Sequence, residues 1–189
     1  MLSDKNNESQ RLFIAVDVPT EVKEELARIQ SYYKPRLAFR GAYSPVENAH
    51  ITLSFLGNFP VSLIPELDKA LRNIQFPPII AKFGAINIFS NRNQISVLYL
   101  AIVCPEMEKL VQEINAQISP LCTIDDRYFV AHITLARISV VKDQLRFLKT
   151  IKLLVTKEIQ FPINQFSLKK SEHVIDGSVY TDIAQYQLK

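Results

Sequence analysis

A short motif that contains histidine and threonine occurs twice in the sequence. The segment His50–Leu53 (HITL) recurs with the same letters as His132–Leu135, and the chain has 3 histidines in all. Both copies stand in apolar segments rich in β-branched and aromatic residues, a composition typical of strands. A repeated context for two of three histidines is hard to attribute to chance, so the motif is the first candidate for chemistry.

The spacing within each motif predicts which side chains act together. In a strand, residues i and i+2 project from the same face. His50 therefore projects with Thr52, and His132 projects with Thr134. The isoleucine and leucine between and after them point to the opposite face. If the two strands are neighbours, two imidazoles and two hydroxyls converge on one cleft.

Two facing imidazoles suit the hydrolysis of a phosphodiester without a metal. Imidazole has an ordinary pKa of about 6.5, so it can hold or release a proton near neutral pH. One neutral histidine can take a proton from an attacking water, and one protonated histidine can give a proton to the leaving oxygen. Each such step contributes about 10²–10⁴-fold. The hydroxyls of Thr52 and Thr134 can donate to the non-bridging phosphate oxygens.

Two alternatives to catalysis are open for the histidine pair. The first is a pair of buried structural histidines, which would need hydrogen-bond partners in the core. The second is a zinc site, but no cysteine or acidic residue stands at ligand spacing beside either motif. His173 lacks the motif, and we expect it at the surface or in a hairpin.

Four further residues are candidates for substrate binding. Arg137 follows Thr134 by three positions, which fits strand alternation poorly, so a phosphate contact and a surface ion pair both stay open. Arg127 precedes the second motif and carries the same two alternatives. Tyr43 and Phe129 are candidates to stack on a base, with packing in the core as the alternative. The pair Lys169-Lys170 is predicted to be a solvated surface.

The composition limits the class of protein. With 189 residues and 48% hydrophobic residues, the chain can bury one core shared by two small lobes. Its net charge of +3 is far below the dense positive charge of a protein that binds long nucleic acids. Cys104 and Cys122 indicate reduced thiols. The polar start and the lack of a long apolar run predict a cytoplasmic protein with no membrane contact. A monomer is the default expectation, and the sequence indicates no cofactor, no metal and no protein partner.

The pattern along the chain predicts an α+β fold with antiparallel sheets and helices on their outer faces. Residues 1–10 are expected to form a flexible tail and residues 11–189 a single bilobal domain. Within the first motif strand, alternation places Phe55 with Ile51, away from His50. Strands are expected over 11–18, 40–46, 50–56, 79–89, 95–103, 128–138, 158–169, 171–175 and 179–187, and helices over 19–34, 63–74, 105–118 and 144–150.

The chain resembles a known superfamily over most of its length. The segments Arg11–Pro19, Pro45–Gly57 and Arg127–Arg137, together with Ser171, Gly177 and Tyr180, resemble the two-histidine phosphoesterases. Within them the resemblance is closest to the bacterial and archaeal RNA 2′,3′-cyclic phosphodiesterases, historically called 2′-5′ RNA ligases. Tyr43 stands where that group often has tryptophan, and an alanine precedes each motif histidine.

This resemblance implies a function and a division of roles. It implies a bilobal fold with approximate two-fold symmetry and hydrolysis of 2′,3′-cyclic phosphate at RNA 3′ ends, or in small cyclic nucleotides, to a 2′-phosphate. His50 then resembles the proton donor and His132 the proton acceptor, a division that the spacing does not reveal. Ligation of 2′-5′ ends, the reverse direction, and a catalytically weak nucleotide-binding module on the same fold stay open as alternatives.

Overall fold

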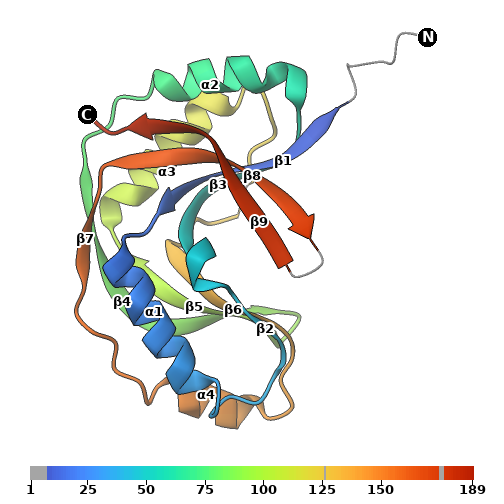
Figure 1. Ribbon diagram of the computed structural model, residues 1–189, viewed down its shortest axis with the longest axis vertical. Coiled ribbons are helices and arrows are strands. Elements are labelled where there is room, and N and C mark those ends of the chain that lie inside the picture. Colours follow the sequence, from blue (N-terminus) through green and yellow to red (C-terminus); the bar gives the residue numbers. More distant parts are fainter. Residues whose placement is uncertain (1–7, 126, 175–176) are drawn as a thin grey trace.

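All strand pairings in the described part of the computed structural model, residues 8–125, 127–174 and 177–189, are antiparallel. They build one curved sheet in the order β7-β4-β5-β6-β3-β1-β8-β9, and β2 also pairs with β6 (Figure 1). The strands are β1 (Ser9–Asp17), β2 (Arg40–Tyr43), β3 (His50–Pro60), β4 (Ile79–Asn91), β5 (Gln94–Val103), β6 (His132–Val140), β7 (Gln160–Ile163), β8 (Gln165–Val174) and β9 (Gly177–Gln187). The helices are α1 (Thr20–Tyr33), α2 (Ile64–Arg72), α3 (Pro105–Ile118) and α4 (Gln144–Ile151), with short 3₁₀ turns at Val46–Asn48 and Val61–Leu63.

The sheet divides into two lobes at its middle. Among the described residues, β3 and β6 share a single pair, Ile51 with Ile133, whereas the neighbouring pairings are long. Strands β1, β3, β8 and β9 form the first lobe, and β2, β4, β5, β6 and β7 form the second lobe. The expected α+β fold with antiparallel strands is therefore confirmed, whereas the two separate sheets that we expected are joined into one sheet by the pair of Ile51 with Ile133.

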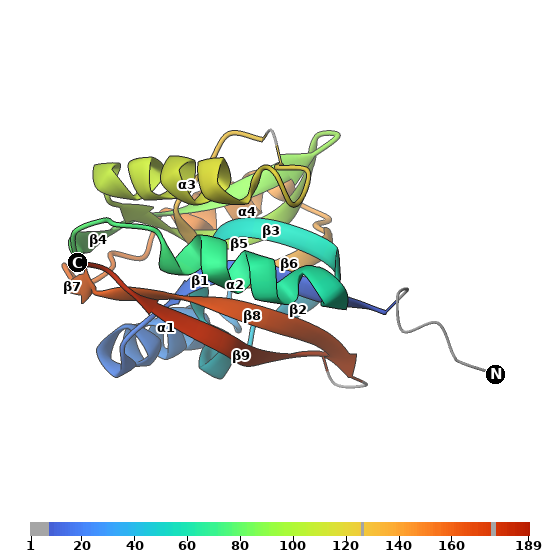
Figure 2. The same cartoon turned by 90° about the horizontal axis from the view of Figure 1, so that it is seen from above.

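Each long helix crosses from the lobe of its preceding strand to the other lobe. α1 follows β1 of the first lobe, yet the Tyr33 hydroxyl donates to the carbonyl oxygen of Ile151, at the end of α4, at 2.7 Å. α3 follows β5 of the second lobe, yet Asn115 accepts a hydrogen bond of 3.0 Å from Ser54 in β3. Figure 2 shows α1 and α3 on opposite sides of the strands.

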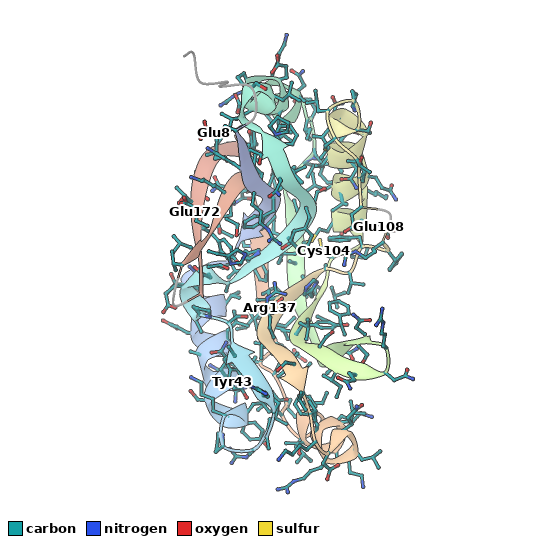
Figure 3. All side chains as sticks on the ribbon, turned by 90° about the vertical axis from the view of Figure 1, so that its right-hand side faces the viewer. Glu8, Tyr43, Cys104, Glu108, Arg137 and Glu172 are labelled. Carbon is teal, nitrogen blue, oxygen red and sulfur yellow. The ribbon has the colours of Figure 1, made fainter. Side chains whose placement is uncertain are left out.

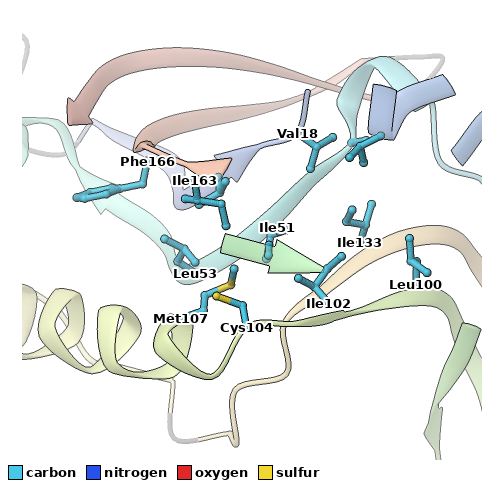
Figure 4. Close-up of a cluster of buried hydrophobic side chains, with 14 of the residues drawn as sticks. Val18, Ile51, Leu53, Leu100, Ile102, Cys104, Met107, Ile133, Ile163 and Phe166 are labelled. Carbon is cyan, nitrogen blue, oxygen red and sulfur yellow. The ribbon is translucent and has the colours of Figure 1, made fainter. Parts of the chain in front are cut away.

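One core of buried side chains continues through both lobes. The predicted helix over 105–118 is α3, and an apolar stripe at helical spacing faces the sheet and is buried: Met107, Leu110, Val111, Ile114 and Ile118. Figure 4 shows Met107 of this stripe beside Leu53 and Ile51 of β3 and Ile133 of β6. The side chains on the faces opposite the histidines therefore hold the two motif strands in place.

Several expected boundaries differ from the structure. Residues 1–7 of the expected tail lie outside the described residues, but Ser9 and Gln10 belong to β1, because they pair with Pro60 and Phe59. β3 extends to Pro60, beyond the expected end near Leu56. The strand expected over 158–169 is divided between β7 and β8, and the one expected over 171–175 is the end of β8, with residue 175 outside the described part.

The structure contains helices of moderate length. Within the ranges that it describes, none of them is both long and apolar enough to cross a membrane.

Candidate active site

The two motif strands lie side by side and run in opposite directions. Ile51 pairs with Ile133, and both side chains are fully buried. Antiparallel register then brings His50 opposite Thr134, and Thr52 opposite His132. The four polar side chains share the face opposite to the buried isoleucines, and all four are half-buried. The pair of isoleucines is thus the centre of an approximate two-fold relation between the motifs.

Each imidazole is held in the same way by the chain that precedes it. The Nδ1 atom of His50 lies 2.6 Å from the carbonyl oxygen of Asn48, and that of His132 lies 2.7 Å from the carbonyl oxygen of Val130. A carbonyl oxygen can only accept, so Nδ1 carries the hydrogen in both rings. The Nε2 atoms are therefore left for proton transfer, and that of His50 lies 3.1 Å from the Thr52 hydroxyl oxygen.

A β-bulge in β6 returns Arg137 to the face of His132. Tyr99 pairs with Thr134 and Leu98 pairs with Ala136, so Leu135 is an extra residue in β6. Leu135 and Ala136 are both buried, and after them Arg137 is exposed. The bulge resolves the poor fit of Arg137 to strand alternation, because a bulge shifts the phase of the strand by one residue.

The first motif strand contains the same irregularity. Ala15 pairs with Thr52 and Ile14 pairs with Ser54, so Leu53 is the extra residue in β3. Phe55, the counterpart of Arg137, consequently lies on the face of His50 and is 49% exposed. The expectation that Phe55 points with Ile51 is wrong, because regular alternation stops at the bulge.

Aromatic rings pack against each of the two imidazoles. The ring centre of His50 lies 5.1 Å from that of Phe13 and 5.2 Å from that of Tyr180. The ring centre of His132 lies 4.9 Å from that of Phe89, and Tyr99 is stacked on Phe89 at 4.2 Å. These rings come from β1 and β9 in the first lobe and from β4 and β5 in the second lobe. Each imidazole is therefore in contact with aromatic rings of its own lobe.

A buried lysine lies on the histidine face of the first lobe. Lys169 pairs in register with Phe13, is 6% exposed, and forms ion pairs with Asp17, at 2.9 Å, and Asp182. The two carboxylates raise its pKa against the effect of burial. The prediction that Lys169 belongs to a solvated surface is wrong, because its aliphatic stem and ammonium group lie between strands. Its neighbour Lys170 pairs with Glu172.

The surroundings lower the pKa of both motif histidines. Burial is the largest cause for each, because it penalises the charged imidazolium. The carbonyl hydrogen bonds act in the opposite direction. The charge of Lys169 lowers the pKa of His50 and the Asp17 carboxylate raises it, whereas the charge of Arg137 lowers the pKa of His132. His132 also lowers the pKa of His50, so the two imidazoles are within electrostatic reach.

Three of the other candidates lie apart from this arrangement. Tyr43 pairs in register with Ala136, on the face opposite to Arg137, and its ring packs against Phe39 (Figure 3). Its hydroxyl is buried with no hydrogen-bond partner among the described residues, so the expectation of base stacking by Tyr43 is not supported by its position. Arg127 forms an ion pair with Asp125.

Phe129 lies near the start of β6 but faces a different hollow. That hollow is lined by Phe129, Tyr128, Cys104 and Glu108, at the junction of β5 with α3 (Figure 3). Within the described ranges, no group of three or more histidine, cysteine or acidic side chains is arranged to hold a metal ion. The residues that the structure brings together are thus His50, His132, the two threonines and Arg137.

The chain is similar to several known proteins. The family model described as LigT like Phosphoesterase matches residues 16–99, a stretch that includes the first motif and ends before the second. An RNA 2′,3′-cyclic phosphodiesterase from Methanocaldococcus jannaschii is 28% identical over 93% of this chain and 99% of its own length. An RNA 2′,3′-cyclic phosphodiesterase from Thermotoga maritima is 26% identical over 95% of this chain and 96% of its own.

Solved structures share the fold over nearly the whole chain. A crystal structure of a Thermus thermophilus protein has a TM-score of 0.81 at 27% identity, and the match covers 94% of this chain and 97% of that one. Escherichia coli LigT, crystallised with 3′-AMP, has a TM-score of 0.74 at 22% identity, covering 96% and 99%. The latter likeness is one of fold.

Proposed function

We propose that the chain is a LigT-like phosphoesterase and acts as an RNA 2′,3′-cyclic phosphodiesterase that uses two histidines and no metal. Its substrates are RNA 3′ ends that carry a 2′,3′-cyclic phosphate, or small cyclic nucleotides. The relatives that align over nearly the whole chain carry the name of this activity. The observation that carries the proposal is the antiparallel pairing of the two motifs about Ile51 and Ile133.

The reaction begins with the attack of water on phosphorus. The neutral Nε2 atom of His132 accepts a proton from the water while the water oxygen forms a bond to phosphorus. This role needs an Nε2 lone pair, which the hydrogen bond from Nδ1 to Val130 leaves available. The positive charge of Arg137 supports it as well, because it lowers the pKa of His132 and keeps the ring neutral until the water is in place.

The reaction ends with the departure of the 3′ oxygen. The protonated Nε2 atom of His50 donates its proton as the bond from phosphorus to the 3′ oxygen breaks, which gives a 2′-phosphate and a 3′-hydroxyl. The Asp17 carboxylate supports this role, because it raises the pKa of His50 and favours the protonated ring. After one turnover His132 is protonated and His50 is neutral, and exchange with solvent restores both.

The negative charge that develops on the phosphate oxygens needs hydrogen-bond donors on the face of the sheet that carries the two histidines. The Thr52 hydroxyl lies 3.1 Å from Nε2 of His50, and Thr134 has the same place in the second motif, so both hydroxyls can donate to the non-bridging oxygens. Arg137 adds a guanidinium group, which can bind two phosphate oxygens at once. On the side of the first lobe, the exposed ring of Phe55 offers an apolar surface for a base.

The direct test is turnover of a defined substrate. The protein is incubated with a 2′,3′-cyclic nucleotide and with a short RNA that ends in a 2′,3′-cyclic phosphate, each in the presence of a chelator. We expect a 2′-phosphate product from at least one of them with unchanged rate in the chelator. Binding without turnover would instead favour a nucleotide-binding module, and loss of activity in the chelator would contradict the metal-independent mechanism.

Substitution of each motif histidine tests whether both imidazoles transfer protons in the reaction. We expect His50→Ala and His132→Ala each to lower kcat by about 10²–10⁴-fold, because each removes one proton-transfer step. His173→Ala is the matched control, since His173 is exposed in β8 and hydrogen-bonds with Ser178. Its kcat should stay within about twofold of the wild-type value. Near-normal kcat in either motif variant would rule out the mechanism.

A further inference from the structure

A buried amide side chain holds the bulge that turns Arg137 toward the cleft. Gln30 of α1 is 6% exposed, and its Nε2 atom donates to the carbonyl oxygens of Ser44, at 2.7 Å, and Leu135, at 3.2 Å. Leu135 is the extra residue of the bulge in β6. The backbone nitrogen of Ser44 donates to the same Leu135 oxygen at 2.9 Å. Gln30 thus links the bulge to the chain that follows β2.

The other lobe contains a counterpart of this arrangement. Asn115 of α3 occupies the position in its helix that Gln30 occupies in α1, counted from the first helical residue. It accepts a hydrogen bond of 3.0 Å from Ser54, which directly follows the extra residue Leu53 of β3. Each crossing helix therefore places one amide side chain at the bulge of the opposite lobe. The contacts differ in chemistry, because Gln30 donates to backbone oxygens and Asn115 accepts from a side-chain hydroxyl, but each lies at the bulge of the opposite lobe.

The bulge at Leu135 determines on which face of β6 the guanidinium group of Arg137 lies. Without the extra residue, regular alternation would turn Arg137 away from Thr134 and toward the buried face. We propose that Gln30 is a positioning residue for Arg137: it fixes the bulge at Leu135 and so holds the guanidinium group beside His132, where the reacting phosphate binds. This inference rests on the proposed function for the role of Arg137. It assigns Gln30 no contact with substrate.

A purely structural role for Gln30 makes a different prediction from a positioning role. If Gln30 only stabilises the fold, its replacement acts independently of Arg137, and the two effects on activity multiply. If Gln30 acts through Arg137, its replacement has little further effect once the arginine is absent. A double-mutant cycle therefore separates the two roles.

The kinetic experiment uses Gln30→Met, Arg137→Ala and the double variant with a 2′,3′-cyclic nucleotide. Methionine retains the length of the side chain but cannot donate a hydrogen bond. We expect Gln30→Met to lower kcat/KM by about tenfold in the wild-type background, and by less than about twofold in the Arg137→Ala background. Equal losses in both backgrounds would overturn the proposal.

The titration of His132 gives a readout that does not depend on catalysis. Because Arg137 lowers the pKa of His132, displacement of the guanidinium group should raise it. NMR titration of the histidine ring protons should show a higher pKa for His132 in both single variants, and no additional rise in the double variant. An unchanged pKa of His132 in Gln30→Met would overturn the proposal, even if the wild-type protein hydrolyses no cyclic phosphate.

Two controls keep the result interpretable. Gln112→Met makes the same replacement at an exposed position of α3 and should leave both the kinetics and the pKa of His132 unchanged. If Gln30→Met does not fold, Gln30→Glu retains size and polarity and replaces it in the cycle. Asn115→Leu disturbs the other bulge, so its effect should multiply with that of Arg137→Ala. An effect of Asn115→Leu that disappears with Arg137 would contradict separate control of the two bulges.

Discussion

At the scale of single residues, the burial of the two imidazoles determines how activity should depend on pH. His132 must be neutral and His50 protonated, so kcat/KM should rise through one pKa and fall through the other. Burial lowers both pKa values below the ordinary 6.5, so we expect the optimum of kcat/KM on the acid side of that value. The kcat profile should lie at higher pH, because a bound phosphate anion raises both pKa values. An optimum of kcat/KM above 6.5 would contradict this assignment.

Lys169 should influence the alkaline limb of the same profile. The charge of Lys169 lowers the pKa of His50, whereas the Asp17 carboxylate raises it. Lys169 also forms an ion pair with Asp17 and so offsets the effect of that carboxylate. Lys169→Met removes both effects, so the pKa of His50 should rise and the alkaline limb of kcat/KM should move to higher pH. Lys170→Met is the matched control, since Lys170 pairs with Glu172, and it should leave that limb in place. Identical profiles for the two variants would refute the influence of Lys169.

The sequence predicted the residues of the site unevenly. The two histidines and two threonines could be recognised, because i and i+2 spacing in a strand determines which side chains share a face. Arg137 and Phe55 could not be placed, because a bulge leaves no clear mark in the letters HITLAR or HITLSF. The burial of Lys169 could not be predicted, since one carboxylate partner, Asp17, lies far away in the sequence, and the pairing of Lys169 with Asp182 depends on the register of β8 with β9.

At the scale of elements, a glycine sets how closely β2 approaches β6. Gly41 has a φ of +149°, and a Cβ atom there would lie 2.2 Å from the carbonyl oxygen of Arg137. We expect Gly41→Ala to lower the free energy of unfolding by about 1–3 kcal/mol and to reduce activity, because β2 must move away from the strand that carries Arg137. Urea unfolding and kcat/KM measure the two effects.

Gly177 provides the control for backbone strain. Its φ of +138° is also unfavourable for alanine, but among the described residues, its chain neighbours aside, no atom lies within 4 Å of a Cβ atom built there. Gly177→Ala should therefore show the cost of strain without the clash. If Gly41→Ala is no less stable than Gly177→Ala, the close approach of β2 to β6 does not limit stability.

Element types were easier to predict than their pairing. The helix over residues 105–118 matches the apolar stripe, because helical periodicity is a local property. The boundary between β7 and β8 could not be predicted, since apolar residues continue to alternate with other residues from Ile159 to Leu168 on both sides of Asn164. The pairing of Leu12 with Lys170 was beyond prediction, because no local pattern specifies a partner so far along the chain.

At the scale of the whole molecule, the crossing helices join the lobes into one cooperative unit. Ile51 and Ile133 are fully buried where the lobes meet, so Ile51→Ala and Ile133→Ala should each cost about 2–5 kcal/mol. Because α1 and α3 each pack on the lobe opposite to their own strand, unfolding should stay a single transition in both variants. Circular dichroism and tyrosine fluorescence should give coincident curves. Separate transitions would show that the lobes unfold independently.

The two-lobed architecture was expected from the resemblance, but the exchange of helices was not. An amphipathic stripe shows that a helix has a buried face, and it does not say which sheet covers that face. The hydrogen bonds of Gln30 and Asn115 across the lobes are long-range contacts of this kind. They lie outside what periodicity can predict, although they bear directly on the site.

The position of β8 beside β1 also has a consequence for synthesis on the ribosome. β1 leaves the ribosome early and can pair with β3 along one edge. Its other edge stays unpaired until β8 has been synthesised. Until then the backbone groups of Leu12 to Ala15 have no strand to bind, and an open strand edge invites association with other chains. We therefore expect the nascent chain to depend on a chaperone over this interval, and to complete its first lobe after its second.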